Sequence, residues 1–243
     1  MSQIKGITNL SLVDFDGEVC ATLFLGGCNF RCKFCGNSSL VLQPYKLENM
    51  PIEPIIENLN KFKNYLTAVC ITGGEPLIHG LKLIPLMKRI KDLGLKVKLD
   101  TNGMFPYILD YYIEKKLIDY IAMDIKAPLT QMKYNKICGK RLSIEKLSLI
   151  ALSIDRIMHS NVNYEFRTTV VPGFHIEKDI EQICKYSIKG AKRYALQNFW
   201  NCGTLVSNKC PEKGFSPTEL ENFATIAKKY VQEVKIRNLN QNL

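Results

Sequence analysis

Residues 19–35 read VCATLFLGGCNFRCKFC, an apolar run that two glycines end and three cysteines follow. The run 19–25 predicts a buried strand, because it is short, apolar and bounded by turn residues. Cys28, Cys32 and Cys35 stand close enough for one loop to bring three thiolates around a small inorganic centre. The loop offers no fourth cysteine, whereas a structural zinc site is normally closed by four ligands. Three thiolates on a 4Fe–4S cubane would leave one iron free to bind a small molecule.

The pattern of an apolar run followed by turn residues recurs along the chain. Such runs predict five further strands, at 67–72, 95–100, 118–124, 163–171 and 193–199, and a short last strand at 234–236. Apolar stripes and caps predict helices at 52–66, up to Leu93, at 105–113, and near 143–158, 176–188 and 217–230. Strands that alternate with helices indicate a parallel sheet with right-handed crossovers. Six such units predict an α/β fold, an open partial (β/α)6 barrel, formed by residues 1–243 as a single domain.

Composition limits the classes of function. The 243 residues are 46% hydrophobic, and Lys plus Arg exceed Asp plus Glu by 33 − 23 = 10. A positive balance favours anionic partners, but without a long basic run it indicates a solvated lysine-rich surface, so nucleic-acid binding has little support. We see no signal peptide and no apolar run of membrane-spanning length. The nine cysteines therefore predict a reduced, cytoplasmic protein in which clustered cysteines bind metal.

The stretch Thr72-Gly73-Gly74-Glu75-Pro76 directly follows the second predicted strand. Two glycines let the backbone approach a ligand closely, and their carbonyls and the Glu75 carboxylate could hold a cationic amino group. A strand-to-helix turn with Pro76 near the helix start is the alternative. Phe34 either packs in the core, shields the metal centre, or presents its backbone to an aromatic ligand.

With both motifs intact and in this order, the chain resembles the radical S-adenosylmethionine (SAM) enzymes. The resemblance implies a 4Fe–4S cluster on Cys28, Cys32 and Cys35, whose fourth iron is chelated by the amino and carboxylate groups of SAM. It implies that Gly73, Gly74 and Glu75 bind the amino group, and it extends to the open partial barrel of that superfamily. Among the other cysteines, Cys20 and Cys70 are expected to be buried hydrophobes, and Cys138 and Cys184 to be incidental.

Charged residues stand at the ends of later strands. Asp124 and Lys126 are two residues apart and share one side of a strand, and so do Glu165, Arg167 and Thr169. Structural ion pairs Asp124–Lys126 and Glu165–Arg167 are one interpretation.

These strand ends also resemble the activating enzymes of glycyl radical enzymes. That resemblance implies that Lys126 and Arg167 hold the SAM carboxylate, and that Asp100 and Asp124 lie by the ribose and methionine, around a monovalent cation if one is bound. It makes Asn198 a candidate for the adenine contact.

The hypothesis is therefore a SAM-dependent activase that installs a glycyl radical on a partner enzyme under anaerobic conditions. The resemblance implies anaerobic ribonucleotide reductase as the partner and a flavodoxin- or ferredoxin-type electron donor. Two alternatives stay open: a pyruvate formate-lyase activase, and a radical SAM enzyme that acts on a small molecule such as a deazapurine precursor. The Asp-Gly-Pro-Gly element of lyase activases is only Asp16-Gly17-Glu18 here, which counts against the lyase assignment.

Overall fold

The computed structural model describes residues 3–239, and its centre is one sheet of eight strands in the order β1 to β8. The strands are β1 (Ile4–Ser11), β2 (Cys20–Leu25), β3 (Ala68–Gly73), β4 (Lys96–Thr101), β5 (Tyr120–Asp124), β6 (Asn163–Val170), β7 (Arg193–Asn198) and β8 (Glu233–Arg237). All neighbours pair in parallel except β1 and β2, which pair antiparallel. Strand order follows chain order, as expected for successive right-handed crossovers.

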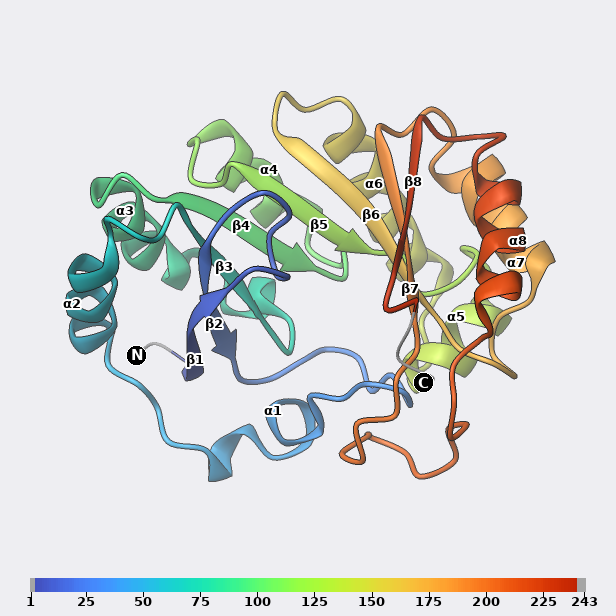
Figure 1. Cartoon of the computed structure of the whole chain (residues 1–243), viewed down its shortest axis with the longest axis horizontal. Helices are drawn as coiled ribbons and strands as arrows, with labels where there is room; N and C mark the ends of the chain where they lie inside the picture. Colours follow the sequence, from blue (N-terminus) through green and yellow to red (C-terminus); the bar gives the residue numbers. More distant parts are fainter. Residues whose placement is uncertain (1–2, 240–243) are drawn as a thin grey trace.

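Most helices follow one another along the outside of the sheet, whereas α1 lies in the loop below it (Figure 1). They are α1 (Ser38–Leu42), α2 (Ile52–Phe62), α3 (Ile84–Asp92), α4 (Pro106–Glu114), α5 (Gln131–Cys138), α6 (Ile144–Met158), α7 (Glu177–Gln182) and α8 (Pro217–Ala227). A 3-10 helix at Pro76–Leu83 precedes α3, and a π-helical turn at Ile183–Ser187 extends α7. Across residues 3–239, none of these helices is both long and apolar enough to span a bilayer.

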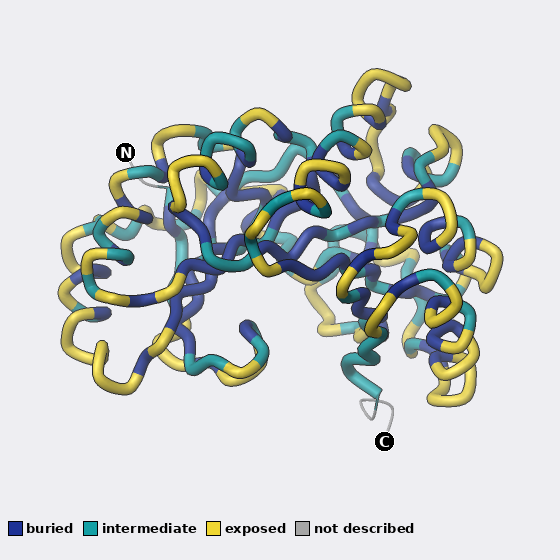
Figure 2. Tube along the Cα trace, turned by 90° about the horizontal axis from the view of Figure 1, so that it is seen from above, coloured by how far each residue is buried: buried dark blue, intermediate teal, exposed yellow. Residues whose placement is uncertain are grey.

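The core lies between the sheet and the surrounding helices. Five helices face the sheet with their apolar sides. Each contributes a buried side chain to the core: Leu59, Met87, Leu109, Ile150 and Ile180. Buried residues run along the strands in the middle of the molecule, and exposed ones occupy the outer turns (Figure 2). This burial on both faces explains why the strands are nearly continuous apolar runs in the sequence.

The structure confirms the predicted α/β fold with an open partial barrel. Strands β2 to β7 are the six predicted parallel strands, with ends within two residues of the expected ones, and β8 extends the short strand expected at 234–236. Three elements near the site were not predicted: the antiparallel strand β1 and the short helices α1 and α5. Within residues 3–239, β1 and β8 are the two edges of the sheet, so the barrel stays open between them.

Candidate functional site

One cavity of about 790 Å³ opens at the carboxyl ends of the strands. Parallel α/β sheets bind ligands at this end, because the loops that follow the strands converge there. All the site residues that the sequence suggested line this cavity: Cys28, Cys32, Phe34, Cys35, Gly73, Gly74, Glu75, Asp100, Asp124, Lys126, Arg167 and Asn198. The fold therefore brings together residues from six different strand ends, while their individual roles stay predictions.

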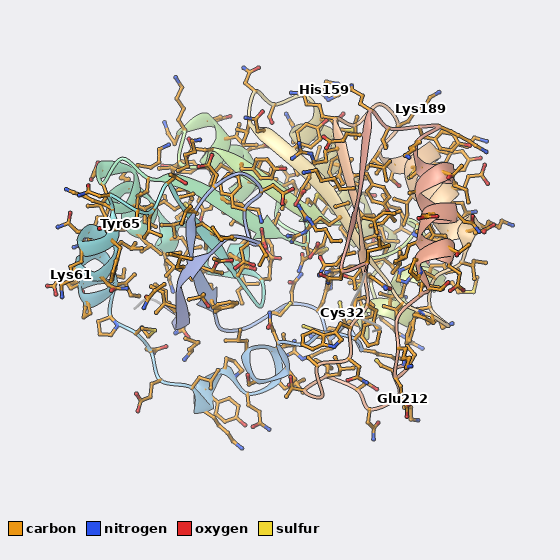
Figure 3. The ribbon with its side chains drawn as sticks, viewed as in Figure 1. Cys32, Lys61, Tyr65, His159, Lys189 and Glu212 are labelled. Atoms are coloured by element: carbon orange, nitrogen blue, oxygen red, sulfur yellow. The ribbon has the colours of Figure 1, made fainter. Side chains whose placement is uncertain are left out.

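The three cysteines lie in the loop that leaves β2, below the parallel strands, where Figure 3 labels Cys32. The Arg31 guanidinium donates to the carbonyls of Cys28 and Phe30, both at 2.7 Å, and fixes the first half of the loop. The Cys35 amide donates to the Cys32 carbonyl at 3.1 Å in a tight turn. Burial, followed by the Glu75 charge, raises the pKa of Cys28 to about 12, so this thiol stays protonated unless a metal displaces the proton.

The donor set fits a cluster better than a single ion. Across residues 3–239, no group of three Cys, His, Asp or Glu side chains is placed to hold one metal ion. A cubane cluster requires a different ligand geometry. Each cysteine binds its own iron, so the three sulfurs need not converge on one point. Three free thiols on the wall of one cavity fit this ligand geometry.

The glycines of the Gly73-Gly74-Glu75 turn allow backbone to pack against backbone. A Cβ on Gly73, whose φ is +125°, would lie 2.3 Å from the backbone of Leu25. A Cβ on Gly74 would lie 1.8 Å from the Gly27 carbonyl oxygen and 3.3 Å from Cys28 Cβ. The sequence suggested a close approach to a ligand; the approach that the structure shows is to the cysteine loop itself. The two motifs thus form one unit.

Glu75 is buried, and its carboxylate accepts three hydrogen bonds. Oε1 accepts from the Leu77 amide at 3.1 Å and from the Thr101 hydroxyl at 2.8 Å, and Oε2 accepts from the Asn102 amide at 2.6 Å. A carboxylate offers about four acceptor positions, so one is left for an ammonium group. Burial raises the pKa of Glu75 to about 7 despite these three donors.

A network of buried charges spans β4, β5 and β6. Arg167 Nε lies 2.9 Å from Asp124 Oδ1, and Arg167 Nη2 lies 3.2 Å from Asp100 Oδ2. Lys126 Nζ lies 2.9 Å from Asp124 Oδ2, and Lys98 Nζ lies 2.8 Å from Asp100 Oδ1. Burial alone would raise the pKa of Asp124, but Arg167 and then Lys126 outweigh it and hold that pKa below its usual value.

Three cations and two carboxylates leave this network with one positive charge in excess. A buried excess of charge requires an anionic partner, and the carboxylate of an amino acid would supply one. The predicted ion pair Asp124–Lys126 is present. The other pair is not Glu165–Arg167: the Glu165 carboxylate binds Arg237 of β8 in a bidentate pair at 2.9 Å. Since both aspartates are already paired, this charge balance does not favour the monovalent cation that the resemblance allowed.

Two predicted residues also have clear packing roles. The Phe34 ring packs edge-on against Phe174 and His175, with centroid distances of 6.2 and 6.3 Å. Both ends of the Asn198 amide bind the backbone of Phe215: Nδ2 donates at 2.9 Å, and Oδ1 accepts from its amide at 2.9 Å. The amide keeps one donor and one acceptor position beyond these two bonds, so the adenine contact at Asn198 stays a prediction.

Several residues at the site were not found from the sequence. Arg237 and Asp16 line the cavity and bind each other at 2.8 Å, which ties the β1–β2 loop to β8 across the open side. His175 Nδ1 accepts from the Val171 amide at 3.1 Å, and its Nε2 donates to the Lys126 carbonyl at 2.9 Å, which fixes the backbone of Lys126. Arg237 and His175 lie outside any motif, and Asp16 was considered only as part of Asp16-Gly17-Glu18. The fold brings Asp16 and Arg237 to the cavity wall, and it places His175 against the backbone of Lys126.

Comparison with known proteins matches residues 22–186 to the model of the radical SAM superfamily. A protein of Methanocaldococcus jannaschii, provisionally named a glycyl-radical enzyme activating enzyme, is 34% identical over 98% of this chain and 96% of its own length. The 7-carboxy-7-deazaguanine synthase of Methanopyrus kandleri is 29% identical over 79% of this chain and 82% of its own length. SuiB of Streptococcus suis, solved with the precursor peptide SuiA, superposes with a TM-score of 0.65 at 14% identity and covers 87% of this chain and 46% of that one.

Proposed function

Since this chain belongs to the radical SAM superfamily, we propose that it is an activating enzyme that generates a glycyl radical on a partner protein. The superfamily uses a 4Fe–4S cluster and SAM. The observation that carries the proposal is one cavity wall with three free thiols and, beside them, a buried charge network with one cation in excess. Similarity to an activating enzyme over nearly the whole chain supports it.

In this proposal Cys28, Cys32 and Cys35 hold the cluster. When bound, the reduced cluster supplies the electron that splits a carbon–sulfur bond of SAM, and that chemistry belongs to the cofactor. The protein positions its ligands and excludes water from the reaction. Lys126 and Arg167 carry the excess charge that would receive the SAM carboxylate. The remaining acceptor position on Glu75 would receive its amino group.

Exposed apolar side chains at the cavity mouth favour a protein substrate over a small molecule. Leu12 and Val13 of the β1–β2 loop are 67% and 80% exposed, Trp200 after β7 is 58% exposed, and all three line the cavity. Large apolar side chains that stay exposed together usually mark a surface that a partner covers. A glycine-bearing loop has no side chain at its target carbon, so its backbone could pass between these residues toward the thiols.

Anaerobic ribonucleotide reductase is the partner that we propose, with a flavodoxin- or ferredoxin-type protein as electron donor. A pyruvate formate-lyase type partner is less well supported, because Asp16 binds Lys235 and Arg237 at 2.9 and 2.8 Å. Its carboxylate is thus occupied within the chain. Nine free thiols suit a reducing, cytoplasmic compartment, which is part of the same proposal.

Anaerobic reconstitution with iron and sulfide tests the proposal. The loaded protein should show sulfur-to-iron charge-transfer absorption at about 400 nm. On reduction with SAM it should release 5′-deoxyadenosine and methionine, and with the reductase it should give the doublet EPR signal of a glycyl radical. Cys32→Ala should abolish all of these signals, and Cys210→Ala serves as the cysteine control. A loaded, reducible cluster that never cleaves SAM would refute the proposal.

The small-molecule alternative rests on the similarity to the deazaguanine synthase. It predicts that a deazapurine precursor is converted, with release of 5′-deoxyadenosine that depends on this precursor. The same reconstituted sample distinguishes the two functions. Product formation from the precursor, together with the absence of a glycyl radical on the reductase, would favour the alternative.

A further inference from the structure

Two lysines lie over the Phe174 ring beside the cysteine loop. Lys33 Nζ is 5.8 Å and Lys136 Nζ is 5.7 Å from the ring centroid, within the roughly 6 Å over which an aromatic face attracts a cation. Lys136 Nζ also donates to the Gly173 carbonyl at 3.3 Å. Within residues 3–239, neither ammonium group forms an ion pair with a carboxylate. Both charges are therefore available to a partner.

The surface around these lysines is strongly basic, because four segments of the chain meet at the cysteine loop. They are residues 28–37, 131–141, 171–179 and 205–213. Together they hold nine Lys or Arg and three Asp or Glu, an excess of 9 − 3 = 6 out of the ten excess charges of the whole chain. Backbone hydrogen bonds join them: the Arg31 amide donates to the Cys138 carbonyl at 2.8 Å, and the Ser207 amide donates to the Lys33 carbonyl at 3.0 Å. The sequence showed no long basic run, because the charges of this basic surface come from separate segments.

The basic surface lies next to the thiols but outside the cavity. Lys33 stands between Cys32 and Cys35 in the chain, yet neither it nor Phe174 is among the residues that line the cavity. Phe34 does line the cavity, and its ring packs edge-on against Phe174 with centroids 6.2 Å apart. Two aromatic rings thus lead from the basic surface to the wall that carries the thiols. Electron tunnelling weakens steeply with distance, so an electron donor bound here would be close to the cluster without entering the cavity.

We propose that the basic surface docks an acidic redox protein, which passes one electron to the cluster while SAM and the protein substrate occupy the cavity. The inference rests on the proposed function, which requires an electron for each SAM that is cleaved. One electron leaves the reduced flavin or iron–sulfur centre of the redox protein and enters the 4Fe–4S cluster. The redox protein is oxidised by one electron and the cluster is reduced by one, and no covalent bond forms or breaks.

Charge and position together favour this partner. Opposite charges steer two proteins toward each other and raise the rate of association, and electron-transfer complexes are small and transient. The apolar mouth of the cavity, with Leu12, Val13 and Trp200, carries none of the two lysines and stays open to the substrate. A basic surface also attracts nucleic acid, but nucleic acid would gain nothing from a place beside the thiols.

The binding test uses the full-length protein, reconstituted anaerobically and left oxidised. Biolayer interferometry at low salt measures its association with a flavodoxin and, in parallel, with a bacterial ferredoxin. Lys33→Glu and Lys136→Glu should each lower the association rate constant at least about tenfold, the lower end of what steering contributes. Lys61→Glu is the matched control and should match the wild type, because Lys61 is an exposed lysine of α2 away from Cys32 (Figure 3). The differences should disappear at about 1 M salt, where the Debye length is about 3 Å.

Two further measurements locate the bound redox protein. Hydrogen exchange should show protection at 171–176 and 205–213, and none in the loop of Leu12 and Val13. Reduction of the cluster by the reduced flavodoxin or ferredoxin, followed by the loss of absorption at about 400 nm, should slow by the same factor as association. Dithionite, a small reductant, should reduce the cluster to the same extent in all of these variants.

Several results would overturn the inference. They are equal association of the wild type and both variants of the basic surface, an equal loss in Lys61→Glu, protection of the Leu12 loop instead, and no binding of either redox protein to the wild type. Tighter binding of a short DNA duplex at the same lysines would overturn it in favour of nucleic acid. If Lys33→Glu takes up no cluster, Lys136→Glu decides by the same criteria. The proposed function is tested separately: it would be refuted by a reconstituted wild type that cleaves no SAM with dithionite.

Discussion

Arg167 Nε of β6 lies 2.9 Å from Asp124 Oδ1 of β5, and the two residues are register partners in adjacent parallel strands. The same guanidinium reaches Asp100 of β4, so one side chain joins the ends of three strands. Because all of these groups are largely buried, the network both holds the strand ends together and keeps a cation at the cavity. If Arg167 holds the SAM carboxylate as proposed, stability and ligand binding are coupled at this residue.

Replacement of Arg167 by methionine should weaken both properties. Removal of one partner from a buried charge network typically costs about 3–5 kcal/mol. We expect a loss near the lower end, about 3 kcal/mol in the free energy of unfolding, because Lys126 and Lys98 still pair with the two aspartates. Urea unfolding of the metal-free protein measures this loss.

Arg89→Met is the matched control for that substitution. Arg89 pairs with Glu53 at 3.3 Å on the surface, where the side chains are 41% and 71% exposed. Such a pair contributes about 0–1 kcal/mol, so its loss should hardly change unfolding. Equal destabilisation in the two variants would contradict the buried network as the source of the effect.

Most of the fold follows from local patterns in the sequence, and the exceptions have physical reasons. The strands β2 to β7 are apolar runs because the sheet is buried on both faces. Strand β1 was missed because it is an antiparallel edge strand with two register irregularities, and most of its residues are only partly buried. Helix α5 was missed because it has only eight residues and half of them are polar, so its apolar stripe is short.

The candidate site shows the same division between local and long-range information. Cys28, Cys32, Cys35 and Glu75 stand in short motifs, so the sequence revealed them and the fold placed them in one cavity. The partners that position them come from distant parts of the chain. The Cys138 carbonyl accepts from the Arg31 amide of the cysteine loop, and Thr101 binds Glu75 across 26 residues. Long-range contacts of this kind leave no periodic signal, and a single sequence cannot reveal them.

The raised pKa of Glu75 predicts that SAM binding depends on pH. With a pKa of about 7, the carboxylate becomes protonated as the pH falls and can no longer attract an ammonium group. The affinity for SAM should fall by roughly tenfold per pH unit well below that pKa. Titration of the reduced cluster with SAM, followed by EPR at several pH values, measures this dependence. In Glu75→Gln the affinity should be weak and flat with pH, whereas a slope that persists in this variant would assign the effect to another group.

The same group makes a signed prediction for stability. Its pKa is raised from 4.5 in the unfolded chain to about 7 in the folded one, so the folded chain holds the proton more tightly. The contribution of Glu75 to the free energy of unfolding is therefore largest below pH 4.5 and falls as the pH rises through 7. The difference in unfolding free energy between the wild type and Glu75→Gln should change in this direction across that interval.

Gly74→Ala should separate the two motifs physically. Its new Cβ would lie 1.8 Å from the Gly27 carbonyl oxygen, so the Gly73-Gly74-Glu75 turn or the cysteine loop must move. Overpacking of this kind typically costs about 1–3 kcal/mol. We expect less iron and sulfide per chain after reconstitution. Gly6→Ala is the control, because its nearest neighbour would lie 3.9 Å away. Full cluster content in Gly74→Ala would show that the close packing of the two motifs is not required.

Substitutions at the cavity mouth should separate partner binding from SAM cleavage. Trp200→Ala and Leu12→Asp remove apolar area from two different loops of the cavity lining but leave the thiols and the charge network in place. Aromatic residues at the centre of an interface often contribute about 2 kcal/mol or more, which corresponds to a loss of affinity above roughly tenfold. We expect the reductase concentration needed for half-maximal glycyl radical formation to rise by that factor. The release of 5′-deoxyadenosine without partner should be unchanged. Tyr107→Ala, which truncates an exposed aromatic side chain on α4, should change neither quantity. If the mouth variants lose SAM cleavage and radical transfer in parallel, these side chains shape the SAM site and do not dock a protein loop.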